Sequence, residues 1–365
     1  MKTRNFLLIL AMMLFGITVS VNAQELETQS GTWGGIDWTL TTDGTLTIAP
    51  TKGEPVPDKN APTKRTYKVG QWREAVIYAS NGGASAIGDR PYELSKVKKL
   101  VIEEGVTSIG SFAAQSMTNL TGEVIIPWTV NYIGQEAFQK ATMTKVTFQK
   151  VPEGKEGQEL CIAQGAFKNL IIEEIALPDD RPIHLHAWIL NNCHKLKHVT
   201  LPATIHSFSG SGNHIDYGWT ESGKNEHMIF AYNQNMETIT FGSEEVKKLF
   251  FQKDGSTGTN KRIADVGLTS CLNLQAAIDL AEEGETITLL NNVTLTSSLE
   301  IPEGKDITID LNGYTVSQKQ NKELTEDYSM IKNYGDLTIV DNSANQNGKI
   351  SYTRTALGGG VAKSL

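Results

Sequence analysis

Histidines are the side chains of this sequence best suited to metal binding or acid–base chemistry, and they are concentrated in one stretch. All seven lie within residues 184–227 of the 365-residue chain: His184, His186, His194, His198, His206, His214 and His227. Neutral imidazole is a common ligand of transition metals, and its charge changes near neutral pH. The stretch is therefore the first candidate for a metal site or a binding surface.

A metal site is one interpretation of this stretch. Cys161 and His184 each stand directly before an apolar residue that recurs once per repeat, Ile162 and Leu185, and His186 follows two residues later. If these segments are adjacent strands, about 4.8 Å apart, the three polar side chains converge on one face. Cysteine and histidine ligands favour zinc. The alternative is a solvent-facing polar surface without a metal, and no other cofactor is implied.

A second candidate binding surface is a polar, glycine-containing insertion in residues 210–228. It carries Tyr217, Trp219, Lys224 and His227. Loops on a rigid scaffold often hold binding residues. An aromatic pair of this kind can stack on a sugar or anchor a protein partner. The alternative is a loop that packs on itself and binds nothing.

Catalytic signatures do not accompany these candidates. The sequence has no nucleophile elbow, phosphate loop, zinc-protease helix or calcium-loop motif. Asp306, Asp310 and Asp341 stand near the ends of predicted strands without a set of basic partners. We therefore expect no catalytic residues and no enzymatic activity.

The elements that must position the candidate residues form a repeat. Strand-like segments start at Leu100, Val124, Val146, Ile175, Val199 and Ile239, which by subtraction are 24, 22, 29, 24 and 40 residues apart. A second short segment in the units closes at Ile109, Ile133, Ile162, Leu185 and Phe208. Such spacing is typical of leucine-rich repeats, here with insertions in the third and fifth units. One unit cannot bury its apolar face alone, so the units must stack into a solenoid.

The repeat units resemble the BspA-like leucine-rich repeat family of bacterial surface proteins. The likeness lies in residues 104–113, EGVTSIGSFA, and 133–138, IGQEAF, and it extends over residues 96–245. His186 and Ser209 replace the glycines that the first two units have at Gly110 and Gly134. The resemblance implies a surface-exposed solenoid that contacts proteins of a host or of neighbouring cells.

The N-terminal flank predicts a cap for this solenoid. Residues 30–48 alternate apolar and polar side chains around Asp43-Gly44, which indicates a β-hairpin. Such a hairpin covers the open end of a repeat stack. Trp33, Trp38 and Trp72 are expected in the core of the cap.

The C-terminal part predicts a different kind of module. Leu274, Ala277, Ile278 and Ala281 fall on one helical face, and strands are expected at 286–290, 299–301, 307–311 and 337–341. With 276–279, 284–289 and 309–316 this segment resembles the opening coils of a pectin-lyase-like right-handed parallel β-helix. It is much shorter than such proteins, which indicates a minimal or truncated domain. The resemblance implies carbohydrate binding or polysaccharide degradation as an alternative function.

The first residues predict export. Lys2 and Arg4 precede an apolar run, residues 6–17, and a small-residue site ends at Ala23, as in a cleavable signal peptide. Cys161, Cys193 and Cys271 are too few and too scattered for a disulfide framework, and Cys193 is expected in the core. The net charge of −8 gives no footprint for nucleic acid. We expect an extracellular or cell-surface monomer with no transmembrane segment after the signal is removed.

These observations together predict a mainly β repeat protein: a leucine-rich-repeat solenoid with an N-terminal β-hairpin cap, followed by a short right-handed parallel β-helix. The predicted parts are a signal peptide (1–23), a β cap region (24–95), the repeats (96–251), a polar linker (252–263) and the β-helix-like segment (264–365). The expected function is binding or adhesion to extracellular proteins or glycans. A structural spacer that presents other domains is a further alternative.

Overall fold

The computed structural model of the chain describes residues 27–56, 66–75, 77–78, 87–88, 90–209, 230, 233–251, 262–320 and 329–354. The predicted signal peptide and residues 252–261 of the predicted linker lie outside them. Within the described residues, no helix is long and apolar enough to cross a membrane.

The N-terminal cap is the predicted hairpin with one further strand. Its strands β1 (Gln29–Trp33), β2 (Ile36–Leu40) and β3 (Thr45–Pro50) pair antiparallel. In the turn, the Asp43 carboxylate accepts from the Thr45 amide at 3.0 Å, and Gly44 has a φ of +88°. A side chain at Gly44 would come within 2.6 Å of the Lys96 carbonyl, so glycine is required there. The three tryptophans predicted for the cap core are buried, which confirms that prediction.

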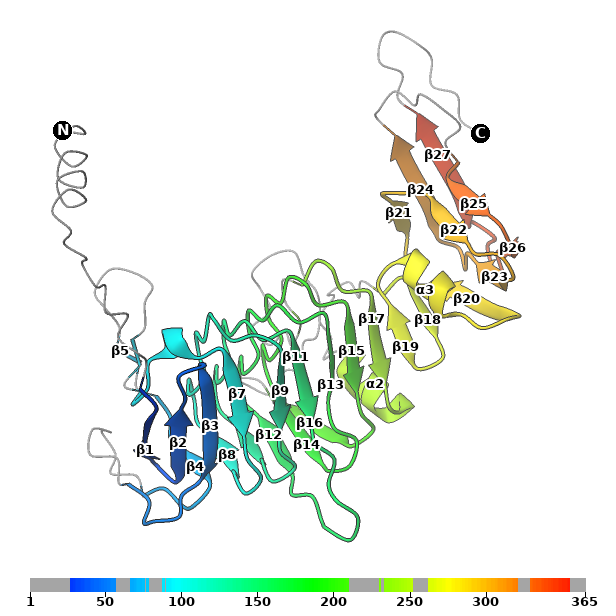
Figure 1. The fold of residues 1–365 in the computed structure, drawn as a ribbon. Coiled ribbons are helices and arrows are strands. Elements are labelled where there is room, and N and C mark those ends of the chain that lie inside the picture. The colour runs from blue at the N-terminus through cyan, green and yellow to red at the C-terminus, as the bar shows by residue number, and fades with distance from the viewer. Residues whose placement is uncertain are drawn as a thin grey trace, which may run out of the picture.

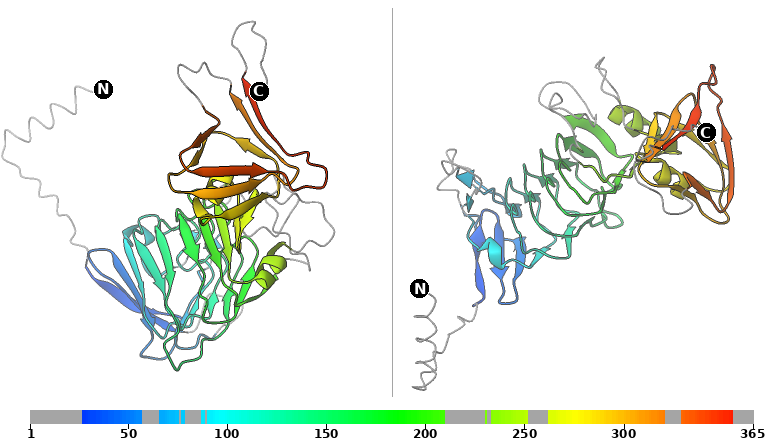
Figure 2. Two further views of the ribbon diagram at one scale, coloured as in Figure 1. Left: turned by 90° about the vertical axis from the view of Figure 1, so that its right-hand side faces the viewer. Right: turned by 90° about the horizontal axis from the view of Figure 1, so that it is seen from above.

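Beyond the cap the chain winds into a solenoid with two walls of mostly parallel strands (Figures 1 and 2). The first wall contains β7 (Lys99–Ile102), β9 (Glu123–Ile126), β11 (Lys145–Phe148), β13 (Glu174–Ala176), β15 (His198–Leu201) and β17 (Thr238–Phe241). The second contains β4 (Gln71–Trp72), β8 (Ser108–Ile109), β10 (Tyr132–Ile133), β12 (Leu160–Ile162), β14 (Ile183–His186) and β16 (Ile205–Ser209). Both sets of predicted segments are thereby confirmed. Strand β3 pairs in parallel with β7, so the cap extends the first wall. Two short strands, β5 (Ile77–Tyr78) and β6 (Ile87–Gly88), and a 3-10 helix, η1 (Leu94–Lys96), complete this part.

Stacked turns form the third side of the solenoid. Four successive coils each place two residues, four apart, in the left-handed region of backbone conformation: Phe112 and Ser116, Glu136 and Lys140, Gly165 and Asn169, Trp188 and Asn192. Backbone amides of one turn donate to carbonyls of the next, as from Phe138 to Ala166 at 2.9 Å. The repeated geometry lets neighbouring turns satisfy each other's backbone groups.

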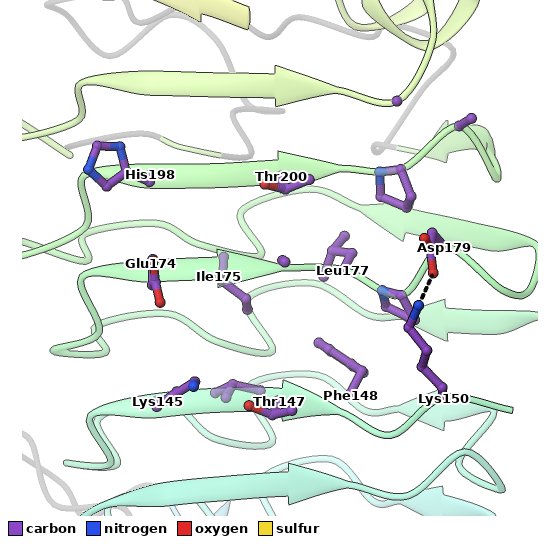
Figure 3. A pocket seen from close by; sticks show the side chains of 16 residues that line it. Lys145, Thr147, Phe148, Lys150, Glu174, Ile175, Leu177, Asp179, His198 and Thr200 are labelled. Carbon is purple, nitrogen blue, oxygen red and sulfur yellow. Dashed lines mark ion pairs between the residues drawn. The ribbon is translucent and has the colours of Figure 1, made fainter. Parts of the chain in front are cut away.

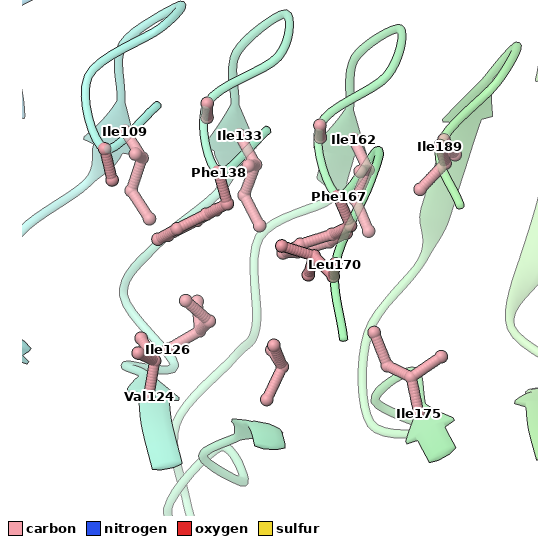
Figure 4. Close-up of a cluster of buried hydrophobic side chains, with 14 of the residues drawn as sticks. Ile109, Val124, Ile126, Ile133, Phe138, Ile162, Phe167, Leu170, Ile175 and Ile189 are labelled. Carbon is pink, nitrogen blue, oxygen red and sulfur yellow. The ribbon is translucent and has the colours of Figure 1, made fainter. Parts of the chain in front are cut away.

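The core consists of apolar columns that run from coil to coil, and Figure 4 shows part of them. Phe138 and Phe167 stack with ring centroids 5.6 Å apart, and Ile133 and Ile162 are fully buried beside them. Burial of each such side chain stabilises the fold by about 1.5–3 kcal/mol. The coils also demand small residues: a side chain at Gly134 would come within 2.4 Å of the Ser111 amide of the preceding coil.

The insertion in the third unit is pinned by a buried arginine. Arg181 is 2% exposed and donates to the carbonyls of Trp128 and, at 3.0 Å, Gln149. Its neighbour Asp180 accepts from the Val151 amide at 2.6 Å. This pair therefore fixes the inserted residues against the wall of the solenoid.

A helix covers the C-terminal end of the repeat core. Helix α2 (Glu244–Phe251) inserts Phe250 against Phe241 and Phe208, with ring centroids 5.3 and 6.1 Å apart. The sequence did not predict this helix. It closes the core as the hairpin closes the other end.

The first wall does not stop at β17. It continues through β19 (Thr269–Cys271) and β18 (Ala264–Val266), which pair antiparallel, into β20 (Glu285–Leu289), β23 (Asp306–Asp310) and β26 (Asp336–Val340). Asp265 accepts from Lys247 of α2 at 3.0 Å and from Arg262 at 3.1 Å. One sheet therefore joins the two parts of the chain, and the β18–β19 pair was not predicted.

The C-terminal part begins with the predicted helix, α3 (Leu274–Leu280), whose first turn is capped by the side chain of Asn273. Its other strands are β21 (Val293–Leu295), β22 (Leu299–Ile301), β24 (Thr315–Gln320), β25 (Ile331–Asn333) and β27 (Lys349–Arg354). Together with β20, β23 and β26 they form three sets of parallel strands: β20–β23–β26, β21–β24–β27 and β22–β25. The four predicted strands are present within one residue of their expected bounds.

Candidate functional site

Two outward faces of the solenoid carry the candidate residues. The predicted binding insertion, with Tyr217, Trp219, Lys224 and His227, lies outside the described residues. The histidine face, which is formed by His184, His186 and His206, is on the second wall. There Cys161 and His184 are cross-strand partners on β12 and β14, as predicted. The other face, on the first wall, was not predicted.

The histidine face is a hydrogen-bonded network. Ser207 on β16 is 2.5 Å from Nδ1 of His184 and 3.0 Å from Nδ1 of His206, whose Nε2 is 2.8 Å from the Glu159 carboxylate. The ring centroids of His184 and His186 are 4.8 Å apart and nearly perpendicular. The strands are shifted in register between Ile183 and His184, in the coil where the sequence replaces the glycine of earlier units by His186.

Burial controls the protonation of this face. It lowers the pKa of both His184 and His186, although for His184 the nearby Glu159 carboxylate opposes the shift. It also raises the pKa of the Cys161 thiol. At neutral pH the two imidazoles are therefore neutral, and Cys161 is a thiol and not an activated thiolate.

The predicted zinc site is not assembled in this geometry. Across the described part of the chain, no three histidine, cysteine or acidic side chains are arranged to hold a metal ion. The register prediction for Cys161 and His184 was right, but His184 engages the Ser207 hydroxyl and the His186 ring instead. Cys193 is fully buried and its thiol donates to the Phe167 carbonyl at 3.2 Å, which confirms its place in the core.

Two of the candidate carboxylates of the C-terminal part stabilise turns. Asp310 is 7% exposed and accepts from the amides of Asn312 and Asn342, each at 2.9 Å. Asp341 accepts from the amides of Gly313 and Gly348 at 2.8 and 2.5 Å. A hydrogen bond from Ser343, followed by those backbone amides, lowers the pKa of Asp341. Both carboxylates thus have structural partners.

The unpredicted face is a trough across strands β11, β13 and β15, with a volume of about 720 Å³ (Figure 3). One rim is formed by the first outward residues of these strands, Lys145, Glu174 and His198. The floor is formed by the small residues two positions further on, Thr147, Ala176 and Thr200. Lys150 and Asp179 form the opposite rim, and Pro178 and Pro202 line the same end of the trough. Short side chains between long ones therefore create the depression.

The position of the trough coincides with a break in strand pairing. The ladder β9–β11 ends at β11, and the next ladder begins at β13. The insertion of the third unit lies between these two strands in the sequence. A sequence signal for the trough does exist: the outward pairs Lys-x-Thr, Glu-x-Ala and His-x-Thr recur at the three strand starts. They become a surface only when the strands are placed side by side.

Charge pairing in the trough is uneven. Lys145 is 3.7 Å from Glu123, Lys150 is 3.8 Å from Asp179, and His198 is 3.8 Å from Glu237. Glu174, on the central strand, is exposed and has no ion pair with any described residue. Figure 3 shows it between Lys145 and His198.

Several solved structures are similar to the chain at low identity. They include a leucine-rich repeat protein from Eubacterium ventriosum, with 15% identity over 86% of this chain and 73% of that one and a TM-score of 0.39. A leucine rich cell surface protein from Faecalibacterium prausnitzii has 14% identity over 87% and 96%, with a TM-score of 0.20. The pneumococcal vaccine antigen PcpA has 16% identity over 81% of this chain and 65% of its own, with a TM-score of 0.24. This chain therefore spans less than two thirds of the antigen. No curated protein sequence matches the chain.

The family comparison is specific to the repeats. A family model described as BspA type leucine rich repeat region matches six copies, in residues 80–154 and 160–254. The match ends before the C-terminal coils, so their resemblance to pectin-lyase-like proteins stays a prediction. The solenoid with its stacked turns and two walls of mostly parallel strands is a BspA-type leucine-rich repeat region.

Proposed function

We propose that this chain is a secreted or surface-exposed binding protein whose repeat solenoid contacts proteins of a host or of neighbouring cells. The observation that carries the proposal is the trough, because it presents residues from three successive coils on a rigid wall. Repeat solenoids use such extended faces for recognition. The proposal includes export by the predicted signal peptide and the absence of enzymatic activity.

A blocking variant tests this function. Ala176 is exposed on the trough floor, so Ala176→Arg fills the depression without altering the core. We expect the chain from Gln24 onward to bind immobilised extracellular matrix proteins or intact cells saturably, and Ala176→Arg to weaken that binding at least tenfold. Thr338→Arg, which places the same side chain on an exposed position of β26, is the matched control. Absence of saturable binding, or equal binding by Ala176→Arg, would refute the proposal.

A structural spacer is the second candidate, and the sheet that continues from β17 into β20 favours it. Such a joint links the two modules through hydrogen-bonded strands. This function predicts a single rigid particle in small-angle X-ray scattering and no partner for the trough. Partner binding that is lost in Ala176→Arg would decide against a spacer alone.

A further inference from the structure

The trough has the dimensions of one extended polypeptide. The row of strand-start residues on one rim and the row of floor residues are two residues apart along each strand, a distance of about 7 Å. It crosses three neighbouring strands: β13 and β15 are paired, at about 4.8 Å, and β11 lies beside β13 without a ladder, so the outer two are roughly 10 Å or more apart. An extended chain covers that length in three or four residues. A single strand of peptide that runs along the solenoid axis therefore fits between the rims.

The charges of the trough favour a basic residue in that peptide. The lysines and His198 already have acidic neighbours, whereas Glu174 has no ion pair with a described residue. A lysine or arginine side chain of a bound peptide, lying over the central strand, would form an ion pair with the Glu174 carboxylate. An acidic partner would instead meet an unpaired like charge.

An apolar contact lies at one end of the same row. Ile125 on β9 is the register partner of Thr147 and extends the floor by one strand. Its side chain is 50% exposed, which makes it one of the most exposed large apolar residues described. Strand β9 is paired with β11, and β11 lies beside β13, so Ile125 is two strands away from the strand of Glu174.

The absence of an exposed phenylalanine, tyrosine or tryptophan in the trough argues for a peptide over a sugar. Among the residues that line the trough, the one phenylalanine, tyrosine or tryptophan is Phe148, and it is 9% exposed; the other aromatic ring is the imidazole of His198. Sugar rings are commonly stacked on exposed aromatic faces. Hydroxyls, a free carboxylate and an exposed isoleucine suit a polypeptide with mixed side chains.

We propose that the trough binds an extended polypeptide segment in which a lysine or arginine contacts Glu174 and an apolar residue, three or four positions away, contacts Ile125. The inference deepens the proposed binding function and rests on it. It names the chemistry of the partner and makes Glu174 and Ile125 the residues that select it.

A peptide array tests this selection. The probes are 15-residue peptides of glycine and serine that carry one leucine and one lysine at every separation, with parallel sets in which glutamine or glutamate replaces lysine. We expect retention of the protein to decrease from lysine to glutamine to glutamate, with a maximum at separations of three and four. Glu174→Gln should weaken binding to the lysine set by about three- to fivefold, as for an exposed ion pair. Glu174→Lys should favour the glutamate set.

Matched variants make each outcome decisive. Glu303→Gln removes the same charge from an exposed turn of the C-terminal coils, outside the repeats, and should bind as the wild type does. Equal retention of the lysine and glutamate sets, or no effect of Glu174→Gln, would overturn the inference. Binding to a glycan array that Ala176→Arg abolishes would overturn it in favour of a sugar site. If matrix proteins or cells bind saturably while the lysine set is not preferred, this inference fails and the proposed function stands.

Discussion

The leucine-rich repeats and the C-terminal coils bury the same kind of apolar column but complete it differently. In the repeats the columns are closed from end to end: Ile48 in the cap is 0% exposed and Phe241 in the last strand is 1% exposed. In the C-terminal coils, Ile309 is 2% exposed, but its register partner Ile339 on β26 is 38% exposed. The burial of a column residue therefore depends on the neighbouring coils as well as on its own coil.

The largest expected difference between the two regions is in the free energy of unfolding that is lost when a side chain of the apolar column is truncated. Phe167→Ala removes a ring that stacks on Phe138 in the middle of the repeats, and we expect a loss of about 4 kcal/mol in the free energy of unfolding. Ile339→Ala removes a side chain that is already partly in water, and we expect about 1 kcal/mol. Denaturant titration measures both. Equal losses would contradict the distinction between closed and open coils.

The joint between the two regions predicts the next effect. Thr269 lies in β19, between Thr240 of β17 and Val266 of β18, so a proline there removes a backbone donor from the interior of a sheet. We expect Thr269→Pro to cost about 3 kcal/mol and to divide unfolding into two transitions. The wild type should unfold in one transition because its sheet is continuous.

Thr269→Ala is the control for this prediction, since it keeps the backbone amide and removes the hydroxyl that is 3.0 Å from the Thr240 hydroxyl. It should retain a single transition when heat capacity is recorded during unfolding. Two transitions in the wild type would show that the modules unfold independently despite the shared sheet.

The two regions also differ in how much of them the sequence predicted. The repeat strands were predictable because the apolar pattern is local and recurs about every 24 residues, so errors in one unit are corrected by the others. The β18–β19 pair was not predictable. Its strands contain only three residues each, and their partners lie on two different modules.

Sites were predicted less well than strands, for a related reason. The sequence placed Cys161 beside His184 correctly, because register follows from the repeat. It did not show that Ser207 and Glu159 would engage the imidazoles, because these contacts depend on side-chain direction. The trough required the outward side chains of three strands to be compared in space, and its floor residue Ala176 is unremarkable in the sequence.

The smallest predicted effect is a difference in pH dependence between the regions, since every histidine lies in residues 184–227 and the C-terminal coils have none. Burial lowers the pKa of His184 and His186 in the folded chain, so the unfolded chain binds protons more readily. Their contribution to stability is therefore present above the ordinary histidine pKa of 6.5 and is lost as the pH falls below it.

The melting temperature should decrease between pH 7.5 and 5.0. In the variant with His184→Gln and His186→Gln this decrease should be smaller by on the order of 1–2 °C. His194→Gln, on an exposed loop, is the control. In Thr269→Pro, where the transitions are separate, only the repeat transition should respond to these substitutions; an equal response of the C-terminal transition would contradict the assignment of this effect to the histidine face.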